Sequence, residues 1–352
     1  MVGSRPETCC LEDQDRMMTV RELIWENQWA FSRTVILRTA IQLRIFDALH
    51  RGHSTVAAIS RACHASPGGV RRLLQALVAM DLLKMGFAAP GRFRLARGVD
   101  KYLVPGEPEY IGDILARSGN MMEGWASMTK SVASGRPWNR VDQAAKAQQF
   151  YPALAAALFG ATLETAGKTA EALGVGRKIR DLRILDVAAG SGVWSIVAAT
   201  RDRSAMVTAV DFPSVLKVTR RFVRKHRLTG RFRYLSGDIR KVDFGREAYD
   251  LVFLGQICHS EGPVWTRRLL RKASRCLVRG GHLVIAEFLP NNERSGPLFP
   301  LVFSLHMFLM TQEGDTFSQA DFGKWLRTAG FSSPKRLKGI RPPAAVLHAR
   351  KK

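Results

Sequence analysis

The chain has 352 residues, of which 46% are hydrophobic and 24% charged, values that suit a globular protein large enough for two domains and a full buried core. The longest apolar run, residues 298–310, is too short to span a bilayer, and the N-terminal residues contain no apolar signal core. We therefore expect a cytoplasmic protein without a membrane span. The five cysteines lack the spacing of zinc ligands, so we expect neither a metal nor a disulfide framework.

The charge balance is strongly basic: 54 Lys and Arg residues against 30 Asp and Glu residues give a formal net charge of +24. Such a charge attracts nucleic acid, anionic membranes or acidic substrates without distinguishing among them. Residues 217–233, 267–282 and 324–352 contain no acidic residue. Because these runs lie on separate segments, they favour solvated helix faces over a single binding stripe.

Residues 1–18 are expected to form a flexible tail, and helices follow it. Apolar residues recur at helical spacing from Val20 to Leu49. Ser54 can cap a short helix ending near Ala62, and Ser66-Pro67 opens another. Two short strand-like pieces then flank residues 89–91, a hairpin pattern. Three helices and a β-ribbon are typical of a winged-helix domain, to which we assign residues 19–105.

A winged helix by itself suggests DNA binding, with Arg71 and Arg72 of the third helix as phosphate contacts. Nearly every third or fourth residue of Val70–Leu83 is apolar, however, which leaves this helix at most a narrow polar face. The pattern therefore favours a helix that packs against protein.

Residues 106–176 are predicted to form a helical connector, and the chain then changes character. Short apolar segments rich in β-branched residues alternate with helical spans, as in a parallel sheet covered on both faces. We expect strands at Ile184–Val187, Met206–Asp211, Phe232–Leu235, Leu251–Leu254 and Leu283–Phe288. The last two strand-like pieces, Arg336–Ile340 and Val346–Arg350, predict a hairpin and hence one antiparallel strand. The fold class is α/β for residues 177–352.

Acidic residues and glycines follow three consecutive strands of this sheet. The first strand contains Asp186 and leads into a turn with Gly190 and Gly192, after which a helix begins. Glycines let backbone amides approach a ligand closely, and a helix N-terminus favours negative charge. The second strand ends in Asp211, where a carboxylate can hold the hydroxyls of a ribose, and the third precedes Asp238. These strand ends predict a nucleoside-binding cleft.

Almost the whole chain resembles the class I S-adenosylmethionine-dependent O-methyltransferases of the caffeate, hydroxyneurosporene and acetylserotonin type. The motifs that carry the resemblance are LDVAAGSG, AVDFPSVL, SGDI, ICHSEG, RGGHLVIAEF and EGDTFSQADFGKWLRTAGF. The resemblance implies a winged-helix dimerisation domain, a Rossmann-like catalytic domain and a homodimer. It also implies S-adenosylmethionine as methyl donor, S-adenosylhomocysteine as product, and no metal.

The resemblance also assigns residues to the cofactor. Gly190 and Gly192 would lie along its methionine part, Asp186 would support the turn or the amino group, and Asp211 would bind the ribose. Asp238 and Ile239 would meet the adenine. The full set of expected cofactor residues is Asp186, Ala188, Gly190, Gly192, Asp211, Phe212, Asp238, Ile239 and Gln256. Ala188 stands where plant relatives usually have glycine, and it is tolerated as long as it avoids positive φ.

His259 in ICHSEG matches the general base of the family. A phenol with a pKa near ~10 is mostly protonated at pH 7, so a nearby imidazole assists methyl transfer by removing the proton. In plant relatives an acid follows the histidine, and a second acid orients it. This chain has Ser260 and then Glu261, and Gln319 occupies the position of the second acid. We expect Gln319 or Glu261 to hold His259, with Asp315 as a substitute; alternatively, His259 only shapes the pocket.

The acceptor pocket is predicted from Met and aromatic side chains of the middle helices and the apolar run, which suit a flat aromatic or isoprenoid acceptor. The candidates are Met121, Met122, Trp125, Phe150, Phe303, Met307, Phe308 and Thr311. His306 in the same run is expected to be a satisfied core histidine. Two alternatives stay open: a nucleic-acid-binding or nucleic-acid-methylating protein, and a cofactor-binding relative with C-methylation or other chemistry.

Overall fold

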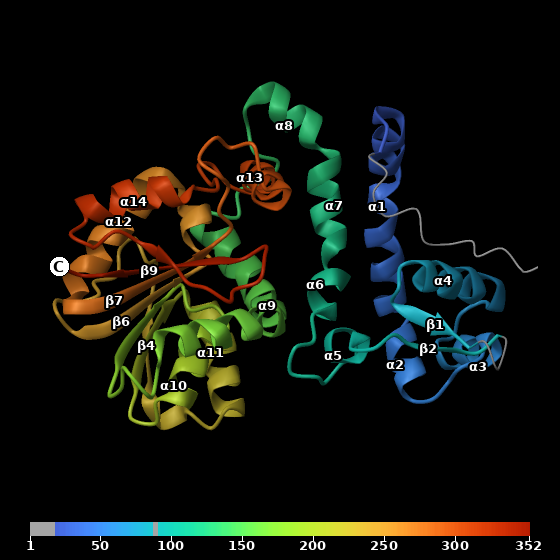
Figure 1. Ribbon diagram of the computed structural model, residues 1–352, viewed down its shortest axis with the longest axis horizontal. Coiled ribbons are helices and arrows are strands. Elements are labelled where there is room, and N and C mark those ends of the chain that lie inside the picture. The colour runs from blue at the N-terminus through green and yellow to red at the C-terminus, as the bar shows by residue number, and fades with distance from the viewer. Residues whose placement is uncertain (1–17, 87–90) are drawn as a thin grey trace, which may run out of the picture. The chain divides into compact units, whose positions relative to one another are not determined.

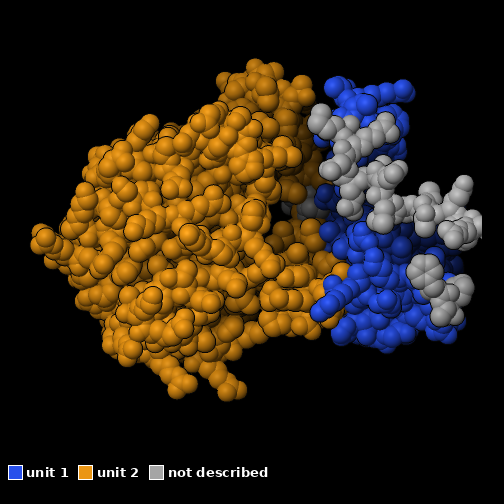
Figure 2. Space-filling model, in the orientation of Figure 1, with its two compact units in different colours: residues 1–97 blue, residues 98–352 orange. Residues whose placement is uncertain are grey.

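A computed structural model describes residues 18–86 and 91–352 (Figure 1). The chain divides into two compact units, residues 1–97 and 98–352, which Figure 2 colours separately. In the described ranges, no helix combines the length and apolarity needed to cross a membrane.

The first unit consists of helices followed by a β-ribbon, as the sequence predicts. Its elements are α1 (Val20–Gln42), α2 (Ile45–His50), α3 (Val56–Ala62), α4 (Pro67–Ala79), β1 (Leu83–Met85) and β2 (Phe93–Leu95). The strands β1 and β2 pair antiparallel. Ser66 caps α4 through Gly69 N–H, with Pro67 in the first turn, as expected. The tip of the hairpin, residues 87–90, lies outside the described residues.

Two local predictions in this unit are wrong. The helix expected from Val20 to Leu49 is broken, because Arg44 takes a left-handed conformation (φ +56°) that separates α1 from α2. The cap of α3 is Thr55, whose hydroxyl accepts a hydrogen bond from Ala58 N–H. Ser54 instead accepts from the guanidinium of Arg92 next to the ribbon. Neither the break nor the exchange of caps changes the apolar periodicity, so the pattern could not reveal them.

The second unit begins with helices and continues into a sheet of seven strands. The leading helices are α5 (Val99–Leu103), α6 (Gly112–Ala116), α7 (Ser118–Ala126), α8 (Met128–Ser134) and the long α9 (Ala144–Leu173). The strands are β3 (Arg183–Val187), β4 (Met206–Asp211), β5 (Phe232–Ser236), β6 (Tyr249–Gly255), β7 (Leu277–Glu287), β8 (Lys335–Arg336) and β9 (Ala345–Arg350). The intervening helices are α10 (Val193–Arg201), α11 (Pro213–Lys225), η1 (Thr229–Arg231), α12 (Cys258–Cys276), α13 (Leu298–Met310) and α14 (Gln319–Thr328).

The strands lie in the order β5-β4-β3-β6-β7-β9-β8, and β9 is antiparallel to both of its neighbours. The expectation of a mostly parallel sheet with one antiparallel strand is therefore confirmed. Successive residues of a strand face opposite sides, so Ile184 packs toward α9, α10 and α11 while Leu185 packs toward α12 and α14. Figure 1 shows these helix layers on the two faces of the sheet.

Candidate active site

The predicted site residues gather at the carboxyl ends of the parallel strands. Connections from β3 run through β4 to β5 on one side, and the chain then returns to β6 and β7 on the other side of β3. Ligands of open α/β sheets bind where the strand order reverses in this way. The glycine turn follows β3 and His259 follows β6 at the start of the next helix, so the structure brings the two sharpest sequence motifs to one edge of the sheet.

The conformation of the glycine turn after β3 is held by its backbone angles and by hydrogen bonds from the neighbouring helices. Gly190 and Gly192 have positive φ angles of +58° and +77°, a conformation that glycine adopts without strain. The Thr219 hydroxyl of α11 donates to the carbonyl of Gly190, and the Ser195 hydroxyl of α10 donates to Asp186 at 2.5 Å. Helix α10 begins directly after the turn, so its first backbone N–H groups lie next to Gly192 and have no partner within the helix.

Ala188 contradicts one expectation. Its φ angle is +54°, so it does not avoid the left-handed region but lies within it. An L-residue with a Cβ pays roughly 1 kcal/mol or more for this conformation. At the next residue, Ala189 N–H donates a hydrogen bond to the carbonyl of Val210 in the neighbouring strand. This bond fixes the start of the turn and offsets the strain at Ala188.

The turn fits a ligand that offers a hydrogen-bond donor. Asp186 is 1% exposed, and its Oδ1 atom is buried without a partner among the described residues. Burial raises the pKa of Asp186 to about 7, because the charged carboxylate loses its water. A side chain added at Gly190 would meet only ordinary van der Waals contacts, so space remains beside the turn. An ammonium group or another cationic donor would satisfy this carboxylate.

Asp211 at the end of β4 is a buried carboxylate with two backbone donors. It accepts from Gly190 N–H at 2.9 Å and from Phe212 N–H at 2.7 Å, and burial raises its pKa to about 6. Phe212 is the N-terminal cap residue of α11 and is half-buried. Asp211 therefore couples the glycine turn to the neighbouring strand end.

The next strand ends supply the remaining expected cofactor residues. Asp238 accepts from Arg240 N–H, while Ile239 is buried and its carbonyl accepts from Lys272. Gln256 lies after β6 with a φ angle of +59°, and its N–H reaches Ala286 of β7. These residues are on the same edge of the sheet as Asp211.

His259 lies in the first turn of α12, is 8% exposed, and is held by Glu287 at the end of β7. One carboxylate oxygen accepts from the backbone N–H of His259 at 3.2 Å, and the other lies 2.7 Å from Nδ1. Because Glu287 accepts at Nδ1, the ring keeps a lone pair on Nε2, the nitrogen that can take a proton. The pair has the geometry of a general base and the acid that orients it.

The expected orienting residues have other roles. Gln319 is exposed at the start of α14, and Glu261 is paired with Arg240 at 2.8 Å. Asp315 is paired with Arg294, although its N–H donates to the carbonyl of His259. The expectation that Gln319 or Glu261 holds the His259 side chain is therefore wrong: Glu287 holds it.

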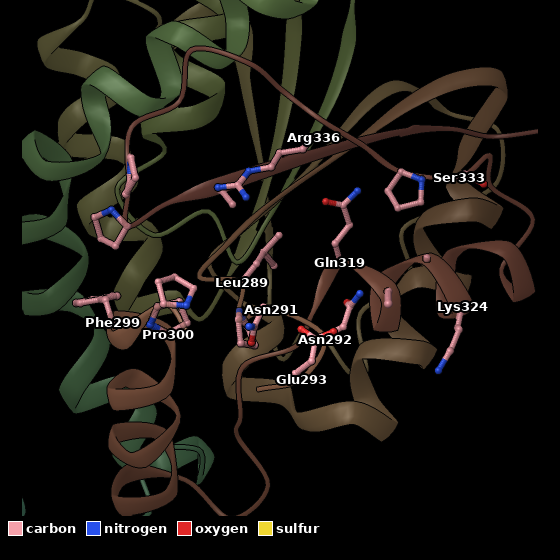
Figure 3. A pocket seen from close by; sticks show the side chains of 18 of the residues that line it. Leu289, Asn291, Asn292, Glu293, Phe299, Pro300, Gln319, Lys324, Ser333 and Arg336 are labelled. Carbon is pink, nitrogen blue, oxygen red and sulfur yellow. The ribbon is translucent and has the colours of Figure 1, made fainter. Parts of the chain in front are cut away.

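Gln319 lines a separate groove of about 790 Å³ beside the end of β7 (Figure 3). Leu289 and Phe299 form part of its apolar wall, and Lys324 and Arg336 lie around it. Phe299 also contacts Phe288 at 5.0 Å between ring centroids, and Phe288 lies 6.3 Å from His259. Gln319 therefore lines this groove together with Phe299, whereas the imidazole of His259 is held by Glu287.

Aromatic rings surround His259 on the side of α13. Phe303 meets the imidazole edge-on at 4.9 Å between ring centroids, and Phe303 also packs on Phe288 at 4.7 Å. The expected acceptor residue Phe303 therefore lies at the base. Trp125 of α7 stacks on His306 of α13 with an interplanar angle of 9°.

The other expected acceptor residues differ in their contacts and in their exposure. Trp125 and Phe150 pack on a cluster formed by Val141, Leu309 and Met310. Met307 is buried and Phe308 is half-buried on α13, whereas Met122 is half-buried and Met121 is 41% exposed on α7. The hydroxyl of Thr311 is used at the end of α13, where it donates to Met307 and accepts from Gly314 N–H.

Two site residues were absent from the sequence predictions. Glu287 is the last residue of β7 and follows an apolar strand, and an acid in that position is a detectable signal. The hydroxyl of Tyr151 on α9 forms a hydrogen bond with the Ser260 side chain, and burial raises the pKa of Tyr151 to about 12. No pattern links Tyr151 to ICHSEG, because the contact joins residues far apart in the chain. Among the described residues, no cluster of three or more His, Cys, Asp or Glu side chains could hold a metal ion.

Comparison with known proteins gives two family matches in separate parts of the chain. Residues 25–104 match the O-methyltransferase dimerisation domain, and residues 173–332 match the O-methyltransferase domain. The chain is 26% identical to 3-hydroxy-5-methyl-1-naphthoate 3-O-methyltransferase of Streptomyces sahachiroi, covering 89% of this chain and 90% of that protein. It is also 26% identical to demethylspheroidene O-methyltransferase of Cereibacter sphaeroides, covering 90% and 83%.

The fold has a close counterpart in human N-acetylserotonin methyltransferase, solved in complex with S-adenosylmethionine. The TM-score is 0.83 at 20% identity, with 97% of this chain and 99% of that chain covered. The family matches and these relatives give no support to the nucleic-acid hypothesis.

Proposed function

Because the chain belongs to the S-adenosylmethionine-dependent O-methyltransferases with an N-terminal dimerisation domain, we propose that it methylates a hydroxyl group of a small, flat aromatic or pigment-like acceptor with His259 as the general base. The observation that carries this proposal is the buried His259–Glu287 pair, which lies on the same sheet edge as the glycine turn. S-adenosylmethionine, when bound, supplies an electrophilic methyl group on a sulfonium.

The residues of the crevice suit this cofactor. The unpartnered Oδ1 of Asp186 accepts a donor from its amino acid part, and Gly190 and Gly192 let the backbone lie close to it. Asp211 holds the ribose hydroxyls, while Ile239 offers an apolar contact and Asp238 a polar one to the adenine. Asp186 and Asp211 both have raised pKa values, and a cation next to them lowers the cost of keeping them charged.

His259 accepts the proton of the acceptor hydroxyl at Nε2, while Glu287 holds Nδ1 and stabilises the imidazolium that forms. Phe303 and Phe288 exclude water from one side of the imidazole. A phenolate forming in such a site is a stronger nucleophile than one in water, since fewer water molecules surround it.

The acceptor is recognised by shape and apolar area. Phe303 and Met307 of α13, with Trp125 of α7, form an adaptable apolar wall next to the base. The two relatives named above act on a naphthoate and on demethylspheroidene, so flat aromatic and pigment-like molecules are the first acceptors to test.

The direct experiment incubates the purified protein with S-adenosylmethionine and a set of naphthols, flavonoids and hydroxylated carotenoids, followed by mass spectrometry. We expect one acceptor class to gain one methyl group on oxygen, with S-adenosylhomocysteine formed in equal amount. Methylation on carbon, or S-adenosylhomocysteine formation without a methylated acceptor, would overturn the proposal. Nicked or duplex nucleic acid serves as the negative control.

We also propose that the protein acts as a homodimer built on the first unit. The match to a dimerisation domain supports this, and so does α1, a helix of 23 residues in which only Ala40 is buried. Leu23, Ile24, Trp25, Trp29 and Phe31 on this helix are 48–64% exposed. Large exposed apolar surfaces mark sites of protein association.

A further inference from the structure

Two buried polar atoms of the second unit have no hydrogen-bond partner among the described residues: Oδ1 of Asp186 and Nδ1 of His306. Nearly all buried polar groups in proteins have a hydrogen-bond partner, so each exception needs an explanation. Asp186 lies at the turn assigned to the cofactor, which supplies a partner. His306 lies on α13, where an equivalent explanation requires a group of the acceptor.

The surroundings of His306 belong to the reaction centre. Its ring lies 6.2 Å from Trp125 in a parallel arrangement and 5.8 Å from Phe303, between ring centroids. Phe303 in turn contacts His259 edge-on. A single phenylalanine therefore links the base to a second imidazole, and the walls around both are aromatic.

The chemistry of His306 restricts what can bind to it. Burial, together with the nearby His259, lowers the pKa of His306, so the ring is neutral at pH 7. A neutral imidazole has one donor and one acceptor nitrogen. Its χ2 torsion is broad and roughly two-fold, so a turn of the ring can present either nitrogen to a ligand. A hydroxyl or carbonyl oxygen fits this pair of roles without bringing a charge into the apolar site.

We propose that His306 determines specificity by binding a second oxygen substituent of the acceptor, one that is separate from the hydroxyl that is methylated. The acceptors are then aromatic molecules with at least two oxygen groups, dihydroxy or hydroxy-carbonyl compounds, with the reacting hydroxyl at His259 and the other at His306. This inference rests on the proposed function, because it places the acceptor between α7, α13 and the base.

An acceptor without the second oxygen leaves the buried Nδ1 atom of His306 unpaired. A site that is built to hydrogen-bond a substrate group discriminates strongly against the analogue that lacks it. From the usual contribution of a neutral hydrogen bond, we expect the second oxygen to improve binding by about tenfold.

The test compares naphthol with dihydroxynaphthalenes whose two hydroxyls are at different spacings. Binding is measured by calorimetry in the presence of S-adenosylhomocysteine, and kcat/KM is measured by methyl transfer. The variants are His306→Phe, which keeps the ring but removes both nitrogens, and His306→Asn, which keeps an amide near Nδ1. His226→Phe removes an exposed histidine elsewhere in the same unit, at the C-terminal cap of α11, and serves as the control.

In the wild type, at least one dihydroxynaphthalene is expected to bind about tenfold more tightly than naphthol. His306→Phe removes this preference while naphthol binding stays within a few-fold; His306→Asn restores part of it, and His226→Phe leaves it intact. Equal binding of both probes by the wild type, or a preference that survives in His306→Phe, overturns the inference. If both probes bind as expected but no methyl is transferred, the proposed function fails and the inference about His306 stands.

Discussion

At the level of single residues, the site depends on a contact that no local pattern could show. His259 and Glu287 are separated by 28 residues, and they meet because β6 and β7 are neighbours whose carboxyl ends lie side by side. The nucleotide-binding residues were predictable, since each directly follows its own strand. The acid Glu287 is visible in the sequence at the end of its strand, but its pairing with His259 was not predictable, because that pairing depends on the strand order.

Glu287→Gln separates charge from geometry at the base. The amide can still accept at Nδ1 but no longer stabilises the imidazolium, and a hydrogen bond to a charged group is worth about 1 to 2 kcal/mol more than a neutral one. We expect kcat for methyl transfer to fall about tenfold or more, while the affinity for S-adenosylmethionine stays unchanged. Gln319→Ala is the control and should change kcat less than about twofold. A larger effect of Gln319→Ala than of Glu287→Gln would contradict this assignment.

Ala188 offers a second test at this level, because its φ of +54° is strained for alanine. Ala188→Gly removes the strain at the cost of some chain entropy, so we expect a net gain of about 0.5 to 1 kcal/mol in the free energy of unfolding. Ala189→Gly at the next position, where φ is not positive, should lose about that amount. Urea denaturation measures both. A loss of stability in Ala188→Gly would show that the strain is absent.

At the level of elements, the sequence predicts the strands of the sheet more closely than the helices of the first unit. The range expected for the second strand, Met206–Asp211, matches β4 at both ends, because apolar runs bounded by turns have clear limits. The break between α1 and α2 escaped prediction, since one left-handed residue at Arg44 leaves the apolar spacing on both sides intact.

The antiparallel pair β7–β9 contains a titratable contact. His282 and His348 share a hydrogen bond of 2.9 Å, and burial lowers both pKa values, that of His348 to about 4. The cations Arg350 and Lys335 lower it further. The unfolded chain takes up this proton near about pH 6.5, so between 6.5 and 4 the unfolded state binds more protons and stability falls as the pH falls.

This pH dependence is checked by urea denaturation between pH 7 and pH 4. The free energy of unfolding should fall less in His348→Gln than in the wild type over this range, because the variant lacks the titrating imidazole. The difference is expected to be on the order of 1 kcal/mol, since water partly screens the half-buried rings. His50→Gln on the surface of α2 should follow the wild type. Identical pH profiles of His348→Gln and the wild type would rule out the His282–His348 pair as the cause.

At the level of the whole molecule, composition and charge predict less than the fold does. The net charge of +24 is compatible with nucleic-acid binding, yet the family matches point to chemistry on small molecules. The basic runs begin on α11, α12 and α14, each of which also contributes buried residues to the core, and they continue into the strands that follow. Total charge could not identify the substrate, because it does not show where the catalytic groups converge.

The proposed homodimer makes a prediction at the same level. Replacing Trp25 and Trp29 of α1 with Glu places charges in the exposed apolar surface and should dissociate the assembly. Native mass spectrometry should then give 39.2 kDa instead of twice that mass. Met206→Glu changes an exposed apolar residue at the start of β4 and should leave the dimer intact. A wild-type mass of one chain at micromolar concentration would contradict the proposal.

We propose that His259 removes the acceptor proton next to the residues that hold the cofactor. The most direct measurement is the single-turnover rate of methyl transfer by His259→Ala, together with its affinity for S-adenosylmethionine. We expect the rate to fall by about 10² to 10⁴, with the affinity for S-adenosylmethionine within a few-fold of the wild type. A rate that stays within a few-fold of the wild type, at equal affinity, would show that His259 is not the base.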